Sequence, residues 1–282
     1  SNDDRPRRSR TMTPAPLPSA PPGSAGRLLA ASAVALPCLV LFAPFFLRGE
    51  IPLNADWLNA NFAPWRLESS PGPPANRELD DPALMQYPLR ETAMRQIRDG
   101  TLPLWNPDML AGMPLAADGF ALPFTPFLPV YLLLPGPEAH AVTLILQMLL
   151  AGAFMYLYLA GRGCSRPAAV LGAWVFMMNG SFIRWLEFHA QMGALLWLPL
   201  AFYGADRIAE GRRRLGGTAF ALAHAGSILA GNLQFVLYFT FAALVYAAWT
   251  LAPGAGRPAR RAAAALGAAL IGAAVGIALA GI

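Results

Sequence analysis

Residues 139–160, with the sequence AHAVTLILQMLLAGAFMYLYLA, decide the fold class of the chain. The stretch contains no Asp, Glu, Lys or Arg, and its length matches the roughly 20 apolar residues that a helix needs to cross a bilayer. Backbone groups find no water in the hydrocarbon core, so such a segment must be helical. Together with further apolar blocks it predicts an all-α polytopic membrane protein with about seven transmembrane helices. The other blocks are 28–47, 167–186, 191–205, 217–230, 235–251 and 262–282.

The composition agrees with this class. The chain has 282 residues, of which 56% are hydrophobic and 13% charged, whereas a soluble domain carries about a quarter charged residues. The net charge of +5 would suit a nucleic-acid partner. However, the arginines lie at the ends of the apolar blocks, where they set orientation in a membrane. The sequence therefore predicts a lipid bilayer as the partner and no nucleic acid.

The chain divides into a short tail and one membrane domain. Residues 1–26 are basic and rich in Pro, Ser and Ala, which predicts a disordered tail. Residues 27–282 form the predicted transmembrane domain, and residues 48–137 form its long first loop. The chain starts with Ser and stops inside an apolar run, so we expect a fragment truncated at its C-terminus.

The arginines predict the orientation. Residues 120–134 are short for a span and are interrupted by Pro123, Pro126 and Pro129. If this segment does not cross, the arginine-rich turns near 164, 212 and 258 lie on the same side as the basic N-terminus. The positive-inside rule makes that side cytoplasmic. The first loop and the turns near 188 and 232 are then extracytoplasmic.

One segment of the loop has helical periodicity. Its apolar residues recur at helical spacing, and Gly100 stands where a helix C-terminus favours glycine. These residues are Leu89, Ala93, Met94 and Ile97. We expect a short amphipathic helix on the membrane surface, whose arginines contact lipid headgroups. These arginines are Arg90, Arg95 and Arg98. Further along, His224 lies inside an apolar block and is expected to bond a neighbouring helix.

Several short motifs in this region recur in the order of a known family. They are Asp81-Pro-Ala-Leu-Met-Gln-Tyr-Pro88, Gly100-Thr-Leu-Pro-Leu-Trp-Asn-Pro107, Ala111-Gly-Met-Pro114, Asn179-Gly180, His189 ahead of Trp197-Leu-Pro-Leu200, and Gly231-Asn-Leu-Gln234. Over residues 50–250 the chain resembles YfhO-like bacterial membrane proteins of the GT-C glycosyltransferase superfamily. The family often has Gly-His-Pro-Gln where this chain has Gly231-Asn-Leu-Gln234.

The resemblance implies an inverting glycosyltransferase of the bacterial inner membrane. It would transfer a sugar from a polyprenyl-phosphate donor to an envelope glycan or lipid acceptor on the extracytoplasmic face. The implied general base is Asp81, with Asp56 as second choice. Asp80 and Asp81 are candidates for holding a divalent cation such as Mg²⁺ or Mn²⁺. The candidate substrate-binding residues are Gln86, Tyr87, Trp105, Asn106, Arg184, Glu187, His189 and Gln234.

Each candidate also has a structural interpretation. Asp81 before Pro82 suits a helix N-cap, and Arg184 suits a side chain that reaches the interface. His189 can pack under the loop, and Trp105 can anchor it at the membrane surface. Two other functions compete with glycosyl transfer: a transporter or lipid flippase, and a non-catalytic factor for envelope-polymer assembly. The scarcity of charges at mid-depth and the absence of an inverted repeat disfavour transport.

Overall fold

The computed structural model describes residues 24–64, 66–67, 73–74, 79–251, 267, 269–271 and 274. Almost all of the predicted N-terminal tail and most of the predicted last span, 262–282, lie outside these residues. The described chain is predominantly helical, as expected for the all-α class. Its β-structure is one hairpin, in which β1 (Trp105–Asn106) pairs antiparallel with β2 (Met113–Pro114).

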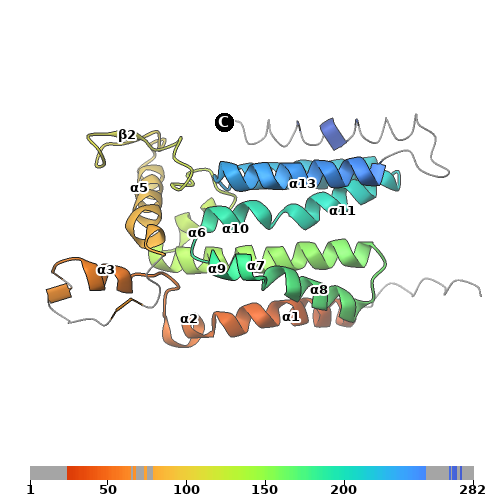
Figure 1. Cartoon of the computed structure of the whole chain (residues 1–282), viewed down its shortest axis with the longest axis horizontal. Helices are drawn as coiled ribbons and strands as arrows, with labels where there is room; N and C mark the ends of the chain where they lie inside the picture. The colour runs from red at the N-terminus through yellow and green to blue at the C-terminus, as the bar shows by residue number, and fades with distance from the viewer. Residues whose placement is uncertain are drawn as a thin grey trace, which may run out of the picture.

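A bundle of helices runs along the long axis of the molecule (Figure 1). Its members are α1 (Ser24–Leu41), α7 (Gly136–Gly161), α8 (Arg166–Met177), α10 (His189–Leu195), α11 (Leu198–Ala209), α12 (Arg213–Ile228) and α13 (Leu233–Leu251). The short elements are α2 (Ala43–Arg48), α3 (Asp56–Asn61), η1 (Pro82–Gln86), α5 (Tyr87–Arg98), α6 (Leu128–Leu133) and α9 (Gly180–Arg184). We call the end with α3, α5 and the hairpin the loop end. The opposite end, with the α7–α8 and α11–α12 turns, is the turn end.

Two described helices are long and apolar enough to cross a membrane unbroken, Gly136–Gly161 and Leu233–Thr250. The expectation of about seven transmembrane helices is therefore not supported by the described helices. Three predicted spans are each divided into two helices: 28–47 at Phe42, 167–186 at 178–179, and 191–205 at 196–197. α12 has 16 residues.

Prolines and a cap explain these three divisions. Pro44 and Pro199 stand in the first turns of α2 and α11, where a proline fits but cannot continue a preceding helix. Asn179 caps α9 by accepting a hydrogen bond from the backbone N–H of Phe182. The average hydropathy of an apolar block does not reveal where one helix ends and the next begins.

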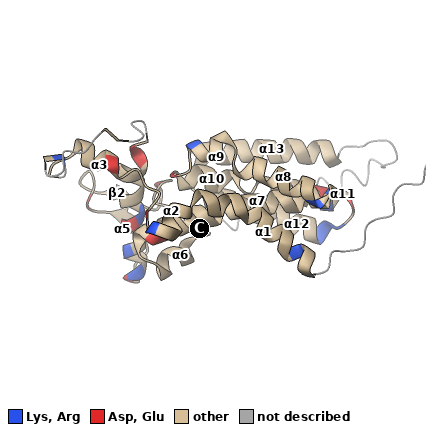
Figure 2. Ribbon diagram, turned by 90° about the horizontal axis from the view of Figure 1, so that it is seen from below, with Lys and Arg blue, Asp and Glu red and all other residues tan. Residues whose placement is uncertain are grey.

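The core between α11, α12 and α13 is built largely from alanine, whereas the core between α1, α7 and α8 is built largely from larger apolar side chains. α11 and α12 pack most closely at Gly204 and Gly216, where a Cβ on Gly204 would lie 2.8 Å from the Gly216 carbonyl oxygen. The outward faces of the bundle also carry large apolar side chains. Leu29 is 74% exposed, Val175 65% and Phe241 70%. Charged residues gather at both ends, and the middle of the bundle is almost free of them (Figure 2).

The predicted amphipathic helix is present as α5 and is followed by Gly100 at φ +75°. Its apolar face is not free to meet a membrane, however, because protein covers it. Leu89 and Ala93 pack with Leu115 and Ala121, and Met94 packs with Tyr131 and Ala139. α5 crosses the direction of the bundle helices (Figure 1). It therefore docks the loop on the bundle.

The proline-rich segment 120–134 contains one helix, α6, of six residues. At 1.5 Å per residue this helix is about 9 Å long, which is too short to cross the roughly 30 Å hydrocarbon core. α6 packs against α5 and α7 at the loop end. It places Tyr131 among the polar residues described next.

Candidate functional site

A buried polar network lies at the loop end. Arg90 from α5, Tyr131 from α6, His140 from α7 and His189 from α10 are each at most 2% exposed. His189 Nε2 lies 3.0 Å from His140 Nδ1, and His140 Nε2 lies 3.2 Å from the carbonyl oxygen of Pro52. Arg90 Nη1 lies 3.3 Å from the Tyr131 hydroxyl and 3.5 Å from His140 Nδ1. Four helices thus meet through polar side chains.

The hydrogen-bond directions in this network are fixed by its two ends. A carbonyl only accepts, so His140 must carry its proton on Nε2, which leaves Nδ1 as the acceptor. His189 then donates from Nε2 to His140 Nδ1. His189 Nδ1, 3.4 Å from the Tyr131 oxygen, accepts from that hydroxyl. Both histidines are therefore neutral, and Arg90 is the only charged member of the network.

Further buried polar atoms around the network have no hydrogen-bond partner. They are Arg90 Nε and Nη2, both amide atoms of Gln86, Thr143 Oγ1, Gln147 Oε1 and Gln191 Oε1. His140, Thr143 and Gln147 follow one face of α7, and Gln147 Nε2 donates to the backbone oxygen of His189 over 3.1 Å. Buried polar groups without partners are costly to a folded protein, so these atoms mark the network as a candidate functional site.

An acidic edge, defined as Asp56, Asp80, Asp81 and Glu187, lies beside the network. The backbone N–H of Asn54 donates to Glu187 Oε2 over 2.6 Å, and the Asn54 side chain donates to the Leu79 carbonyl over 2.7 Å. This residue therefore joins three distant segments. α3, which begins at Asp56, packs against η1, which follows Asp81. The acids are thus gathered at one place.

The acidic edge and the network share a short segment of chain. The Pro52 carbonyl accepts from His140, and the Asn54 N–H donates to Glu187, two residues before His189. Burial raises the pKa of Glu187, as does the charge of Asp56, while the Asn54 N–H opposes both. Residues 52–54 therefore connect the network to the acidic edge through hydrogen bonds.

The two candidate bases are accessible. Asp81 is exposed, its backbone is helical with φ −51° and ψ −43°, and its side chain makes no capping hydrogen bond. Asp81 stands at the N-cap position before Pro82, as its structural interpretation predicted, but its side chain does not cap the helix. Its carboxylate forms no hydrogen bond or ion pair with the described residues. Asp56 is exposed at the start of α3.

Three predicted substrate-binding residues belong to the network or touch it. His189 is a member. Gln86 is 1% exposed and lies one helical turn before Arg90. The Tyr87 ring meets the His140 ring edge to face at 5.9 Å. Burial raises the pKa of the Tyr87 hydroxyl, and the nearby Glu91 raises it further.

The remaining candidates lie elsewhere. Trp105 and Asn106 form β1, and Asn106 Oδ1 accepts from the backbone N–H of Asp108 over 3.0 Å, so both shape the hairpin. Gln234 is exposed and donates to the Tyr238 hydroxyl on its own helix over 2.7 Å. Arg184 is exposed, with its guanidinium 5.9 Å from the Trp185 ring.

Three members of the network, Arg90, Tyr131 and His140, were not predicted from the sequence as site residues, and the predicted partner of His224 was wrong. Arg90 was expected at lipid headgroups but is buried, whereas Arg95 and Arg98 are more exposed. Its place on the buried stripe of α5, beside Leu89, was the available signal. Tyr131 and His140 carried no spacing signal, because their partners are distant in sequence. His224 bonds the Phe220 carbonyl of its own helix over 2.9 Å rather than a neighbouring helix.

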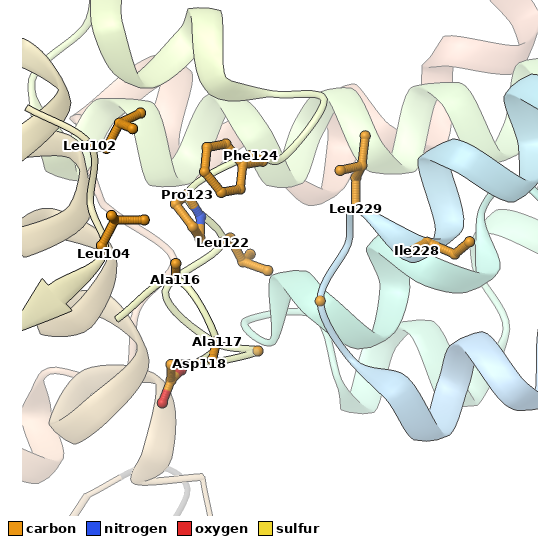
Figure 3. A pocket seen from close by; sticks show the side chains of 12 residues that line it. Leu102, Leu104, Ala116, Ala117, Asp118, Leu122, Pro123, Phe124, Ile228 and Leu229 are labelled. Carbon is orange, nitrogen blue, oxygen red and sulfur yellow. The ribbon is translucent and has the colours of Figure 1, made fainter. Parts of the chain in front are cut away.

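An apolar cavity of about 380 Å³ lies between the loop and the loop-end termini of α12 and α13 (Figure 3). Leu102, Leu104, Leu122 and Phe124 line one side, and Ile228 and Leu229 the other. Asp118 points away from the cavity (Figure 3) and caps a turn by accepting from the N–H groups of residues 120 and 121. The cavity therefore suits an apolar ligand chain.

A second polar cluster lies at the turn end. Asp206 is 5% exposed and accepts from the Tyr246 hydroxyl over 3.0 Å, and its carboxylate lies 3.4 Å from Arg162 Nη1. Arg207 pairs with Glu210 and donates to the Gly161 carbonyl over 2.8 Å. Each of these buried charges has a partner of opposite sign. The cluster joins α7, α11 and α13.

The described residues contain no group of three or more His, Cys, Asp or Glu side chains placed to hold a metal ion. Asp80 and Asp81 supply two adjacent carboxylates only. Comparison of the chain with family models, curated proteins and solved structures gave no match.

Proposed function

We propose that the chain is part of a membrane glycosyltransferase that transfers a sugar from a polyprenyl-phosphate donor to an envelope glycan or lipid on the extracytoplasmic face. One observation carries this proposal. The loop end gathers exposed carboxylates, including the unpaired Asp81, beside a buried polar network at the end of an apolar bundle. Such a site lies where a lipid-anchored donor meets a water-soluble reactant.

The membrane placement rests on the surface of the bundle. Leucines, valines and aromatic residues are exposed on the outward faces of α1, α8 and α13. A contiguous apolar surface of this kind is rare on a soluble protein. We infer that the interrupted helix pairs also cross the bilayer, which gives a GT-C-like arrangement of about seven spans. By the positive-inside rule, Arg162, Arg207 and residues 212–214 support a cytoplasmic turn end in a bacterial cell.

The chemistry follows from the acidic edge. Asp81 accepts the proton of the acceptor hydroxyl as that oxygen bonds to the anomeric carbon. The bond from this carbon to the donor phosphate breaks, and the polyprenyl phosphate leaves with the electron pair. Attack opposite the leaving group inverts the anomeric centre. Asp56 is the second candidate for the base, and Asp80 with Asp81 would bind a divalent cation if the reaction uses one.

The apolar cavity supports the choice of a lipid donor. Its lining of Leu, Ile, Phe and Pro side chains matches the branched apolar chain of a polyprenyl group. It lies at the loop end, where the proposed bilayer boundary meets the loop. Arg184, exposed at the end of α9, is the candidate contact for the donor phosphate.

A lipid flippase is the competing function, and the buried polar face of α7 favours it. His140, Thr143 and Gln147 extend from the loop end into the bundle, as the wall of a polar path would. By contrast, no observation favours a non-catalytic assembly factor.

Sugar transfer decides between these functions. Membranes containing the protein are given a radiolabelled polyprenyl-phosphate sugar, and label in the envelope fraction is measured. We expect label to appear only with the protein present and with the donor on the extracytoplasmic side. Translocation of the donor without transfer would favour the flippase and refute the proposal.

A further inference from the structure

Arg90 is the one charged side chain of the described chain that is almost fully buried without an opposite charge. It is 2% exposed, and its hydrogen-bond partners are the Tyr131 hydroxyl and the ring of His140. The described residues place no carboxylate in an ion pair with it. Burying a charge without a counter-ion costs several kcal/mol in a real protein. A protein that keeps such a charge uses it for binding or catalysis.

The atoms left free on Arg90 have a specific geometry. Both of its hydrogen bonds use Nη1, whereas Nε and Nη2 have no partner among the described residues. The N–H bonds of Nε and Nη2 point in parallel from the same edge of the planar guanidinium, so together they can bind two oxygens of one oxyanion. The neighbouring histidines carry no oxygen atom, so they cannot supply that oxyanion.

Gln86 carries a further buried donor one helical turn from Arg90. It lies one turn before Arg90 on the continuous η1–α5 helix, which places the two side chains on the same face. It is 1% exposed, and neither of its amide atoms has a partner. The three buried donors are Arg90 Nε, Arg90 Nη2 and Gln86 Nε2, which come from successive helical turns. They suit a tetrahedral oxyanion, which offers more acceptor oxygens than a carboxylate does.

We propose that Arg90 and Gln86 form a buried site for a phosphate group, which the free Nε–Nη2 edge of Arg90 binds in a bidentate manner. The phosphate is either inorganic or the headgroup of a lipid. This inference does not rest on glycosyl transfer, since it concerns binding alone. Because Arg90 is covered, the ligand must displace part of the loop, and we expect slow association.

The test measures binding to the whole chain in detergent and in lipid nanodiscs. Inorganic phosphate is titrated into the detergent sample, and the nanodiscs contain a polyprenyl monophosphate. Thermal unfolding and calorimetry give the affinity for wild type, Arg90→Gln, Arg90→Lys and the control Arg95→Gln. Arg95 lies on the same helix but is exposed.

We expect phosphate to raise the unfolding temperature of wild type and Arg95→Gln equally. Arg90→Gln should bind about 10- to 100-fold more weakly, because it loses charge-assisted hydrogen bonds. Arg90→Lys keeps the charge but not the paired donors, so it should lose about tenfold or more. It also tests the site if Arg90→Gln fails to fold. In phosphate-free buffer, Arg90→Gln should unfold at or above the wild-type temperature, because it removes an uncompensated charge.

The outcomes separate the sources of the ligand. Binding of inorganic phosphate in detergent identifies a free anion, and binding only in nanodiscs with the lipid phosphate identifies a headgroup. Wild-type protein that binds neither would overturn the proposal, as would Arg90 variants that bind as tightly as wild type. Binding without any sugar transfer would leave this site standing and refute only the proposed function.

Discussion

The buried charges at the two ends of the bundle have different partners: those at the turn end form ion pairs, and the one at the loop end contacts only neutral groups. At the turn end, Asp206 faces Arg162 and the Tyr246 hydroxyl, and Arg207 faces Glu210. At the loop end, Arg90 meets only neutral groups, and several buried polar atoms around it have no partner. Paired charges hold helices together, whereas unpaired polar groups reduce stability unless a ligand completes them. We therefore expect the turn end to stabilise the fold and the loop end to bind a ligand.

The largest expected effect tests whether chemistry belongs to the loop end. Asp81→Asn keeps the size of the side chain but removes the proton acceptor. We expect the transfer rate to fall about 10²- to 10⁴-fold with the unfolding temperature unchanged, because the exposed carboxylate makes no structural contact. The measurement is the transfer assay together with thermal unfolding, with Asp56→Asn alongside. Normal turnover in Asp81→Asn would move the base to Asp56 if only that variant is inactive.

The next effect compares two glycines with similar backbones. Gly231 at the loop end has φ +84° and packs against the Gly119 carbonyl, whereas Gly211 at the turn end has φ +89° and open space around it. Gly231→Ala should lower the free energy of unfolding by about 3 kcal/mol, from backbone strain and overpacking together. Gly211→Ala should cost about 1 kcal/mol, from strain alone. Equal losses in chemical denaturation would show that the contact with Gly119 contributes nothing.

A smaller effect tests the turn end. Asp206→Asn keeps an acceptor for Tyr246 but removes the charge that faces Arg162. Because Arg162 is 44% exposed, water compensates part of the loss, and we expect about 1 kcal/mol of destabilisation. The folded variant should transfer sugar at the wild-type rate. A dead but stable Asp206→Asn protein would break the division of roles between the two ends.

The smallest effect is a pH dependence at the loop end. Burial raises the pKa of Glu187 above its ordinary value of 4.5. The native protein then retains a proton that the unfolded chain has released, so stability falls as pH rises through the interval between the two pKa values. Glu187→Gln should flatten this decline, measured as unfolding temperature from about pH 4.5 to 7. Glu210→Gln at the turn end should leave it unchanged, and an unaltered slope in Glu187→Gln would contradict the assignment.

The sequence predicted the helices better than their boundaries. Helices were predicted from the apolar blocks and from the periodicity of residues 89–100, which both depend on local spacing, and the structure contains helices in these regions. The divisions at Phe42 and at 196–197 depend on where Pro44 and Pro199 fall within the blocks, a detail that average hydropathy removes. Trp105 and Asn106, predicted to bind substrate, instead form a strand of the hairpin, where their hydrogen bonds are local and structural.

The site was less predictable, for a physical reason. His140 and His189 meet across 49 residues, and no spacing rule reaches that far. Arg90 was misplaced because an arginine on an amphipathic helix usually turns its charged head toward water or headgroups. Its burial depends on α6, α7 and α10, which together replace water with neutral partners. Burial of a charge is a property of the assembled tertiary structure.

The close approach of Gly204 and Gly216 has a consequence for how the protein is made. α11 and α12 are consecutive in the chain, and their backbones touch, so this helix pair can form as soon as residue 228 has emerged from the ribosome. The buried polar network around the proposed phosphate site instead joins segments from residue 52 to residue 189, and such distant contacts form late. We expect a newly inserted chain to reach a protease-resistant helical hairpin first and to gain affinity for anions only afterwards.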